Sequence, residues 1–270
     1  MAGGPDDTAL TRVQPFFRTL IGRDPAGRSW LPALLAAMPG GRARFGELLD
    51  QPGSLLMTLS VRTPGGSLGA FEQPVAPPRE LAEWFIEHPQ ELTWPEGVTL
   101  SSEMVRLRRA LIYDLPSGSR AKAQQRAREL MKVRSALSRE WWRFDYMTTL
   151  DCLLMTDRLL ITVQGTRAES PAPATDWYPQ RSELVRTLEA AWQLGTDRPW
   201  ASVLISDRPL AEGTAEQLEQ VLPAATPHRS EAERVELGAG YLGNLTWEAA
   251  CAAVGLPVST LPERPSPPGA

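Results

Sequence analysis

A carboxylate and an amide stand at the ends of two neighbouring apolar runs in this sequence. Asp151 lies at the head of the run 150–155 (LDCLLM). Gln164 directly follows the run 159–163 (LLITV). A carboxylate beside a buried strand is costly unless it is paired, hydrogen-bonded or bound to a metal ion. If the two runs form a hairpin that turns at Asp157, Asp151 and Gln164 lie near each other at its open end, where we expect a candidate site.

The chemistry that such a pair could serve is phosphodiester hydrolysis with a divalent cation. Magnesium prefers oxygen ligands, and a metal ion or a side-chain cation orients the attacking water and offsets the charge that develops on the phosphate. The minimum requirement is one carboxylate, a second oxygen ligand and a nearby cation. Asp151 and Gln164 would supply the two oxygen ligands.

The residues around this pair resemble a bacterial group of PD-(D/E)xK nuclease-like proteins. The pattern of that group is approximately W-W-x-F-E-G-x-T-x-x-D-C-x-L-x-T-D-x-L, an apolar run with E-G-K-R-T-E, and then W-Y-P-x-R-x-Q-L-x-R-N-L-E-A-A. The similarity covers residues 141–192, and a weaker similarity follows at residues 241–256. The matching positions are Trp141, Trp142, Phe144, Asp151, Cys152, Thr156, Asp157, Gly165, Arg167, Glu169, Trp177, Tyr178, Pro179, Arg181, Leu184, Arg186 and Glu189.

The resemblance implies roles for the residues of the two runs. In the superfamily, an aspartate and the glutamate of an E-x-K motif hold the metal ion, and the lysine orients or activates water. The resemblance therefore implies magnesium as the cofactor, with Asp151 and Gln164 as ligands. Asp145, which stands with Tyr146 in place of an upstream Glu-Gly pair, is a further implied ligand.

The catalytic signature is partly eroded. Gln164 replaces the glutamate, and Thr166 replaces the lysine. A glutamine still offers a carbonyl oxygen, whereas a threonine hydroxyl cannot supply positive charge. Arg167 is the adjacent cation and completes the candidate catalytic set, but neighbouring residues of a strand point to opposite faces.

Two functions stay open on this sequence. The first is a magnesium-dependent deoxyribonuclease that uses Asp151, Gln164 and Asp145. The second is a catalytically inactive relative that keeps the scaffold to bind nucleic acid, with DNA favoured, or a protein partner. A cation beside Asp151 and Gln164, from Arg167 or from the two lysines of the chain, Lys122 and Lys132, would favour the enzyme.

A basic stretch precedes the two runs. Residues 120–143 hold eight basic and two acidic side chains, and residues 120–137 have the composition and apolar spacing of a helix. One interpretation is a face that holds phosphates, and the other is a solvated helix face. For Arg181 the alternative to phosphate contact is an ion pair with a nearby glutamate. The candidate nucleic-acid contacts are Lys122, Arg126, Lys132, Arg139 and Arg181.

The order of the elements predicts an α/β fold. A strand near residues 141–146 should precede the two apolar runs, and a helix at 180–194 and a buried strand at 201–206 should follow them. The resemblance sharpens this to a restriction-endonuclease-like core, a central mixed sheet flanked by helices, with helical additions at both ends. We expect three parts. The first is a mostly helical region of unknown role at 1–119, which includes one strand at 55–61. The core with C-terminal helices follows at 120–256, and a disordered Pro-rich tail at 257–270.

Composition excludes several classes of protein. The net charge of −4 and the hydrophobic share of 42% are ordinary for a globular chain. No apolar run reaches eighteen residues and the acidic N-terminus lacks the features of a signal peptide, so we expect a cytoplasmic protein without a membrane partner. Cys152 and Cys251 stand far apart, without partners at metal-ligand spacing, and predict neither a disulfide framework nor a zinc site.

Overall fold

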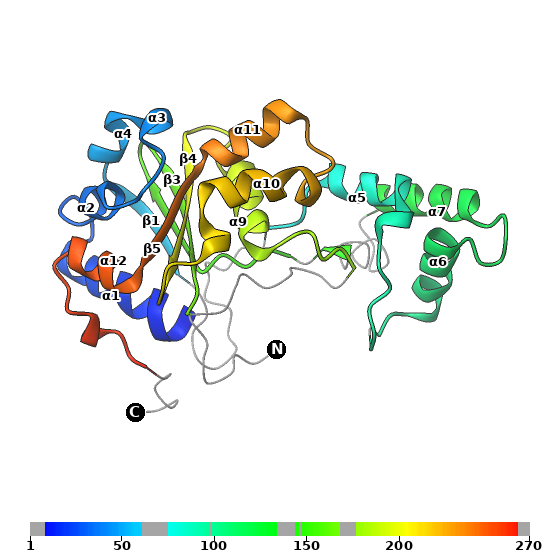
Figure 1. Cartoon of the computed structure of the whole chain (residues 1–270), viewed down its shortest axis with the longest axis horizontal. Coiled ribbons are helices and arrows are strands. Elements are labelled where there is room, and N and C mark those ends of the chain that lie inside the picture. The colour runs from blue at the N-terminus through cyan, green and yellow to red at the C-terminus, as the bar shows by residue number, and fades with distance from the viewer. Residues whose placement is uncertain are drawn as a thin grey trace.

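The described residues form a mixed five-stranded sheet flanked by helices (Figure 1). The computed structural model describes residues 9–60, 75–97, 99–133, 144–145, 147–167 and 177–263. The strand order follows the chain, with antiparallel pairing from β1 to β3 and parallel pairing from β3 to β5. The strands are β1 (Leu55–Ser60), β2 (Cys152–Thr156), β3 (Leu160–Gly165), β4 (Trp200–Ser206) and β5 (Tyr241–Thr246).

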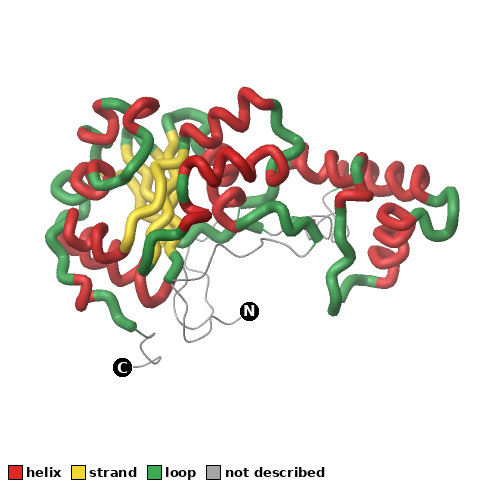
Figure 2. The backbone as a smooth tube through the Cα atoms, viewed as in Figure 1, coloured by secondary structure: helices red, strands yellow, loops and turns green. Residues whose placement is uncertain are grey.

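Helices cover both faces of the sheet, and a further group of helices stands apart from it (Figure 2). On one face lie α1, α2 and α12, and on the other lie α9, α10 and α11. The helices are α1 (Gln14–Arg23), α2 (Leu31–Ala36), α3 (Arg42–Phe45), α4 (Glu47–Asp50), α5 (Arg79–Glu87), α6 (Ser102–Tyr113), α7 (Arg120–Lys132), α9 (Glu183–Leu194), α10 (Ala215–Ala225), α11 (Glu231–Ala239) and α12 (Trp247–Ala253).

The hairpin of β2 and β3 confirms the predicted pair of buried strands. Cys152 pairs with Val163, and Met155 pairs with Leu160, so the turn lies at Asp157 as expected. The hydroxyl of Thr156 accepts a hydrogen bond from the backbone N–H of residue 159 at 2.7 Å, which closes the turn. The alternation of the strands sends every second side chain to the same face of the sheet. Cys152 and Val163 therefore point together into the core beneath α1.

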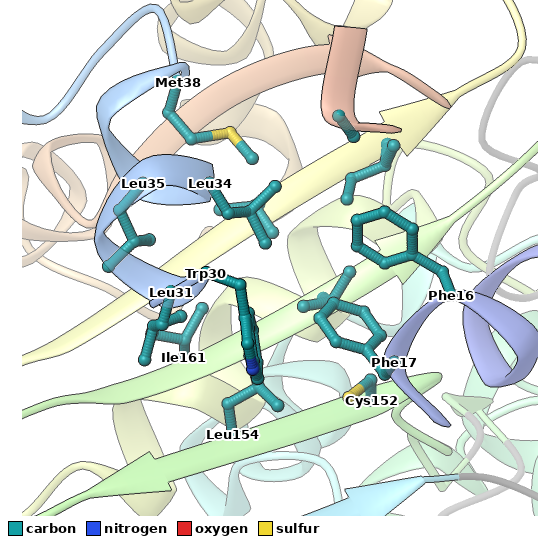
Figure 3. Close-up of a cluster of buried hydrophobic side chains, with 14 of the residues drawn as sticks. Phe16, Phe17, Trp30, Leu31, Leu34, Leu35, Met38, Cys152, Leu154 and Ile161 are labelled. Carbon is teal, nitrogen blue, oxygen red and sulfur yellow. The ribbon is translucent and has the colours of Figure 1, made fainter. Parts of the chain in front are cut away.

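The core on the α1 face joins the beginning of the chain to the central strands (Figure 3). Phe16 and Phe17 of α1 pack with Trp30 over Leu154 and Ile161 of the hairpin. Burial of such side chains contributes about 1.5–3 kcal/mol each to the free energy of folding. The strand that was predicted in the first part of the chain, β1, pairs with β2, so both of the parts divided at residue 119 contribute to one sheet.

The α9 face is built by a crossover between parallel strands. β3 and β4 are parallel neighbours, and α9 connects them across the sheet. The Ser182 hydroxyl accepts the backbone N–H of Val185 at 3.4 Å and caps the start of the helix. Leu184, Val185 and Leu188 then face the sheet, as the predicted amphipathic pattern requires. The start of α9 lies near the end of β3, because the helix runs back along the strands.

A helical lobe, formed by α5, α6 and α7, extends away from the sheet (Figure 1). Phe144, Trp177 and Tyr178 belong to its hydrophobic core, although they come from segments that lead into the sheet. The Tyr178 hydroxyl donates to the carbonyl of Ala224 at 2.6 Å, at the end of α10. Burial raises the pKa of Tyr178 to about 12. Arg108 is fully buried over the Phe144 and Trp177 rings, 3.8 and 4.4 Å from their centroids. Aromatic packing thus ties the lobe to the sheet body.

Several expectations differ from the structure. β5 was not predicted, because its glycine and polar residues hide the strand pattern. Phe144 and Asp145 belong to no strand, and the other residues of the strand expected at 141–146 lie outside the described residues. Residues 257–263 are ordered rather than a disordered tail, since Leu261 is buried in the core on the α1 face; residues 264–270 lie outside the described residues.

Among the described helices, none has the length and apolar character to span a bilayer.

Candidate functional site

The open end of the β2–β3 hairpin brings Asp151 and Gln164 together. The register that pairs Cys152 with Val163 places Asp151 opposite Gln164 at the next position. Since Cys152 and Val163 point to the α1 face, Asp151 and Gln164 point to the α9 face. The Asp151 carboxylate accepts the backbone N–H of Gly165 at 2.8 Å, which fixes it across the two strands. The predicted proximity of the two residues is confirmed.

Gln164 carries a buried acceptor that has no hydrogen-bond partner among the described residues. Its side chain is 4% exposed, and no described group donates to its Oε1 atom. A buried carbonyl oxygen without a donor costs about 1–3 kcal/mol, so such atoms are uncommon unless a ligand satisfies them. The atom belongs to the residue that the sequence predicts as an oxygen ligand. Gln164 therefore offers an unused lone pair in a site that already holds a carboxylate.

Thr166 and Arg167 follow Gln164 but do not complete the E-x-K arrangement. Thr166 is mostly buried, and its carbonyl accepts the Trp247 indole N–H at 3.1 Å. The Arg167 guanidinium donates to the carbonyl of Glu263, in the segment whose Leu261 packs on the α1 face. Arg167 is thereby directed to the face opposite Gln164. The alternation that was noted in the sequence explains this placement, because residues 164 and 167 differ by an odd number of positions.

Asp145 is held in a buried charge network. This network consists of ion pairs between the start of α9 and the segments that surround it. The Asp145 carboxylate lies 2.6 Å from Arg181 Nε and 3.6 Å from Arg186 Nε. Its full set of residues is Asp145, Arg181, Arg186, Glu189, His228 and Arg229.

Glu189 is the second carboxylate of the buried charge network. It lies 2.5 Å from Arg181 Nη1, 2.9 Å from His228 Nε2 and 2.8 Å from Arg229 Nε. Burial alone would raise the pKa of Glu189, but Arg181, His228 and Arg229 together hold it well below its ordinary value. Burial likewise opposes the charged form of Arg181, yet the carboxylates of Glu189 and Asp145 raise its pKa. Each group is thus kept charged by its neighbours.

Arg181 does not contact a nucleic acid at the surface in this arrangement. Its side chain is 1% exposed and touches both carboxylates of the buried charge network. The ion pair with a nearby glutamate, the alternative raised by the sequence, is therefore the observed contact, in the interior rather than on the surface. The same pairing withdraws Asp145 from the proposed metal ligands, because two guanidinium groups already balance its charge.

The oxygen ligands at the open hairpin end fit only a weak metal site. The described residues contain no group of three or more His, Cys, Asp or Glu side chains that could hold a metal ion. Asp151 and Gln164 provide one carboxylate and one amide oxygen. Magnesium can bind through one or two carboxylates when water and substrate phosphates fill its other positions. The residues therefore fit an ion that arrives with its substrate rather than a tightly held resident ion.

The basic residues of α7 lie in the helical lobe, away from the sheet (Figure 1). Lys122 and Lys132 are exposed there, and neither stands in the hairpin site. Arg126 is exposed and lies 3.4 Å from Glu103 of α6 and 3.8 Å from Glu129. Arg139 lies outside the described residues. The cations that would have favoured an enzyme are therefore placed elsewhere by the fold.

The sequence did not reveal the buried charge network. His228 and Arg229 are about forty positions from their partner Glu189, so no local pattern joins them. One signal was present: Arg186 and Glu189 stand three positions apart on a helix whose neighbours are apolar.

No protein-family model matches this chain, and no match was found among curated proteins or solved structures.

Proposed function

We propose that this chain is a PD-(D/E)xK-like protein that acts on DNA, with Asp151 and Gln164 holding magnesium at the open end of the β2–β3 hairpin. The observation that carries the proposal is the buried, unpartnered Oε1 of Gln164 opposite the anchored carboxylate of Asp151. A metal ion would satisfy that oxygen. The cytoplasm is the proposed location.

The fold is compatible with this proposal. The stretch 141–192 that resembles the superfamily contains β2, β3 and most of α9, and β1 and β4 extend the same sheet on either side of this hairpin. The restriction-endonuclease-like core is thus our interpretation of a mixed sheet whose coarse topology agrees with it. The Asp and Gln positions fall on adjacent strands and on one face of the sheet, as a shared metal ion requires.

The residues of the site have distinct tasks. Asp151 supplies negative charge, and its hydrogen bond with the backbone N–H of Gly165 keeps one oxygen oriented. Gln164 supplies a neutral carbonyl oxygen from a buried position. When bound, magnesium would polarise a phosphate oxygen and offset the charge that develops on it. The protein itself places no lysine at position 166, so we expect slow cleavage.

A second candidate function is a nuclease-like scaffold that binds DNA or a protein partner without cutting. The placement of Arg167 favours this candidate, because its guanidinium reaches the carbonyl of Glu263 on the opposite side of the sheet. Thr166 offers a hydroxyl where the superfamily has a cation. With no cation supplied to the site by residue 166 or residue 167, water activation would depend on the metal ion alone.

Cleavage assays separate the two candidates. Purified protein is incubated with plasmid and with single-stranded circular DNA in magnesium or manganese, beside Asp151→Ala and Gln164→Leu. Thr162→Val is the matched control, because Thr162 lies on the same strand and face as Gln164 and also has a buried, unpartnered oxygen. We expect slow cutting by the wild type and the control, and none by the two site variants. Equal cutting by all four proteins would contradict the proposed site.

A restored variant decides the case in which the wild type does not cut. Gln164→Glu combined with Thr166→Lys rebuilds the E-x-K motif on β3. Activity in this variant alone would support the inactive scaffold. Thermal unfolding with and without magnesium adds a readout that is independent of cleavage, since an ion at ten times its Kd stabilises the native state by about 1.4 kcal/mol. No shift in the wild type and no cleavage by either protein would remove the metal site altogether.

A further inference from the structure

A groove of about 490 Å³ lies between α6 and α7 in the helical lobe. Its apolar lining residues are Leu107 and Ala110 of α6, Ala123 of α7, and Leu115 and Pro116 of the loop between the helices. The groove is distant in the fold from the hairpin site, because the lobe extends away from the sheet (Figure 1). We refer to it below as the α6–α7 groove.

Cations line both walls of the α6–α7 groove. Arg106 and Arg109 stand three positions apart on α6, and Lys122 and Arg126 stand four apart on α7, so each pair occupies one helix face. All four are exposed. Glu103 is the acidic residue in the lining, and it lies 3.4 Å from Arg126. Four cations against one carboxylate leave an excess of three positive charges around the groove.

Some cations of the lobe outside the groove are paired with carboxylates. On the α5 side, Arg79 pairs with Glu83 at 2.8 Å, and Arg128 lies 3.8 Å from Glu87. Within the described part of the chain, Arg106, Arg109 and Lys122 form no ion pair; Arg109 instead stands 5.8 Å from the centroid of the Trp94 ring. Like charges that face one groove repel one another, which an anionic ligand would relieve.

The groove also offers uncharged contacts. The hydroxyl of Ser119 in its lining is buried and has no hydrogen-bond partner among the described residues. The backbone N–H of Arg120 is already bound by the Asp114 carboxylate, so the rim cations rather than the start of α7 would carry most of the anion binding. At the end of α6, the half-exposed Tyr113 ring stacks on Trp94 with centroids 6.2 Å apart. The Tyr113–Trp94 pair lies outside the lining of the groove but is linked to it by Arg109, which stands near the Trp94 ring.

We infer that the α6–α7 groove binds single-stranded nucleic acid. Phosphates would contact the Arg and Lys side chains of the lining, and a base would contact its apolar residues or the Tyr113 ring, as in other single-strand binding surfaces. Bases that are stacked and paired in a duplex cannot enter such a groove, so the inference favours single strands over duplexes. The choice of nucleic acid over an acidic peptide rests on the proposed function.

The test is a binding assay that needs no cleavage. Fluorescence anisotropy with a labelled oligothymidylate, in EDTA and at several salt concentrations, compares the wild type with Arg106→Gln/Lys122→Gln. The matched control is Arg79→Gln/Arg128→Gln, which removes the same charge from the same lobe outside the groove. We expect the groove variant to bind about 10-fold more weakly, and its slope of log K against log salt to fall by about 1.4, the value for two lost phosphate contacts on a single strand. The control should change affinity by less than about 2-fold.

Several outcomes would overturn this inference. Equal losses in both double variants would mean that binding follows net charge alone. Failure of the wild type to bind the oligonucleotide would overturn it as well, as would a groove-dependent preference for an acidic peptide such as polyglutamate. Circular dichroism and urea unfolding of each variant confirm that the lobe is folded.

The result is separable from the proposed hairpin site. Asp151→Ala should retain oligonucleotide binding, because its side chain lies on the sheet and outside the groove. If the groove variant binds the oligonucleotide more weakly and no protein shows metal-dependent cleavage, the result would contradict the proposed cleavage activity and leave the groove inference standing. If the wild type does not bind the oligonucleotide and the groove variant cleaves DNA as fast as the wild type, the result would contradict the groove inference and leave the hairpin site standing.

Discussion

The buried charge network and the open hairpin end are both polar clusters in the half of the molecule built around α9, but the network is built from opposite charges in contact, whereas the hairpin end holds a neutral amide oxygen without a described donor. In the network, Glu189 faces Arg181, His228 and Arg229, and Asp145 faces Arg181 and Arg186. At the hairpin, the Oε1 of Gln164 has no described donor.

The difference separates polar groups that maintain the fold from those that could meet a ligand. Opposite charges in contact stabilise one arrangement of the surrounding segments, although Glu189 Oε2 and His228 Nδ1 have no hydrogen-bond partner among the described residues. Gln164 Oε1 differs from other buried oxygens without a described partner, such as the Thr162 hydroxyl, because it belongs to a residue opposite the Asp151 carboxylate, where a ligand could bind both. The predictions below test this contrast, beginning with the network.

The largest effect is expected for Arg181→Met. The substitution removes a cation that touches two buried carboxylates, Asp145 and Glu189, and leaves both of them without their closest partner. Breaking a buried pair in this way costs about 3–5 kcal/mol in the free energy of unfolding. Urea unfolding, followed by tryptophan fluorescence, measures the loss.

Arg79→Met is the control for that measurement. Arg79 forms an exposed pair with Glu83 on α5, and such pairs contribute about 0.3–0.5 kcal/mol. A loss for Arg181→Met that is no larger than the loss for Arg79→Met would show that the network does not stabilise the fold. The buried charge network would then not differ from the hairpin end by its contribution to stability.

A smaller effect is expected from pH. The pKa of Glu189 is lowered in the folded state, so its contribution to stability is complete above the ordinary glutamate value of 4.5 and declines as the pH falls below it. Between pH 4.5 and pH 3, one such group can account for up to about 2 kcal/mol. The free energy of unfolding should therefore fall more steeply in the wild type than in Glu189→Gln. Glu233, whose pKa is lowered mainly by its hydrogen bonds with Ser230, titrates in both proteins and cancels in the comparison. Parallel curves for the two proteins would contradict the network's role.

The sequence predicted the hairpin site better than it predicted the network, for physical reasons. Asp151 and Gln164 meet through a short hairpin, whose register follows from alternation and a turn at Asp157. The network joins residues 145, 181, 189 and 228, which meet only when α9, α10 and the lobe have packed. No local pattern encodes a contact of that range.

The same reasoning explains the other differences. The helix predicted at 180–194 has a clear apolar face and corresponds to α9, which runs from Glu183 to Leu194. β5 was missed because only its first residues are buried, and its pairing with β4 supplies the rest of its stability. The arginines of α6 were missed as groove residues because α7 alone carried the conspicuous run of charge; the groove exists only where both helices pack.

The smallest effect is expected for Gln164→Leu in the absence of metal. Removing a buried acceptor that has no donor leaves no partner unsatisfied, so the free energy of unfolding should change by less than about 1 kcal/mol or rise slightly. Thr162→Val, two positions earlier on the same face, should behave alike. Urea unfolding in EDTA measures both.

A loss of several kcal/mol in Gln164→Leu would place Gln164 with the network, as a residue whose pairing maintains the fold, and would remove the observation on which the metal site depends. Near-neutral stability combined with lost stabilisation by magnesium would sharpen the contrast, because the same oxygen would then contribute nothing to the fold and much to the ligand. Thr162→Val separates these cases, since its hydroxyl is equally buried but lies farther from Asp151 along the strand. Its response to magnesium should match the wild type.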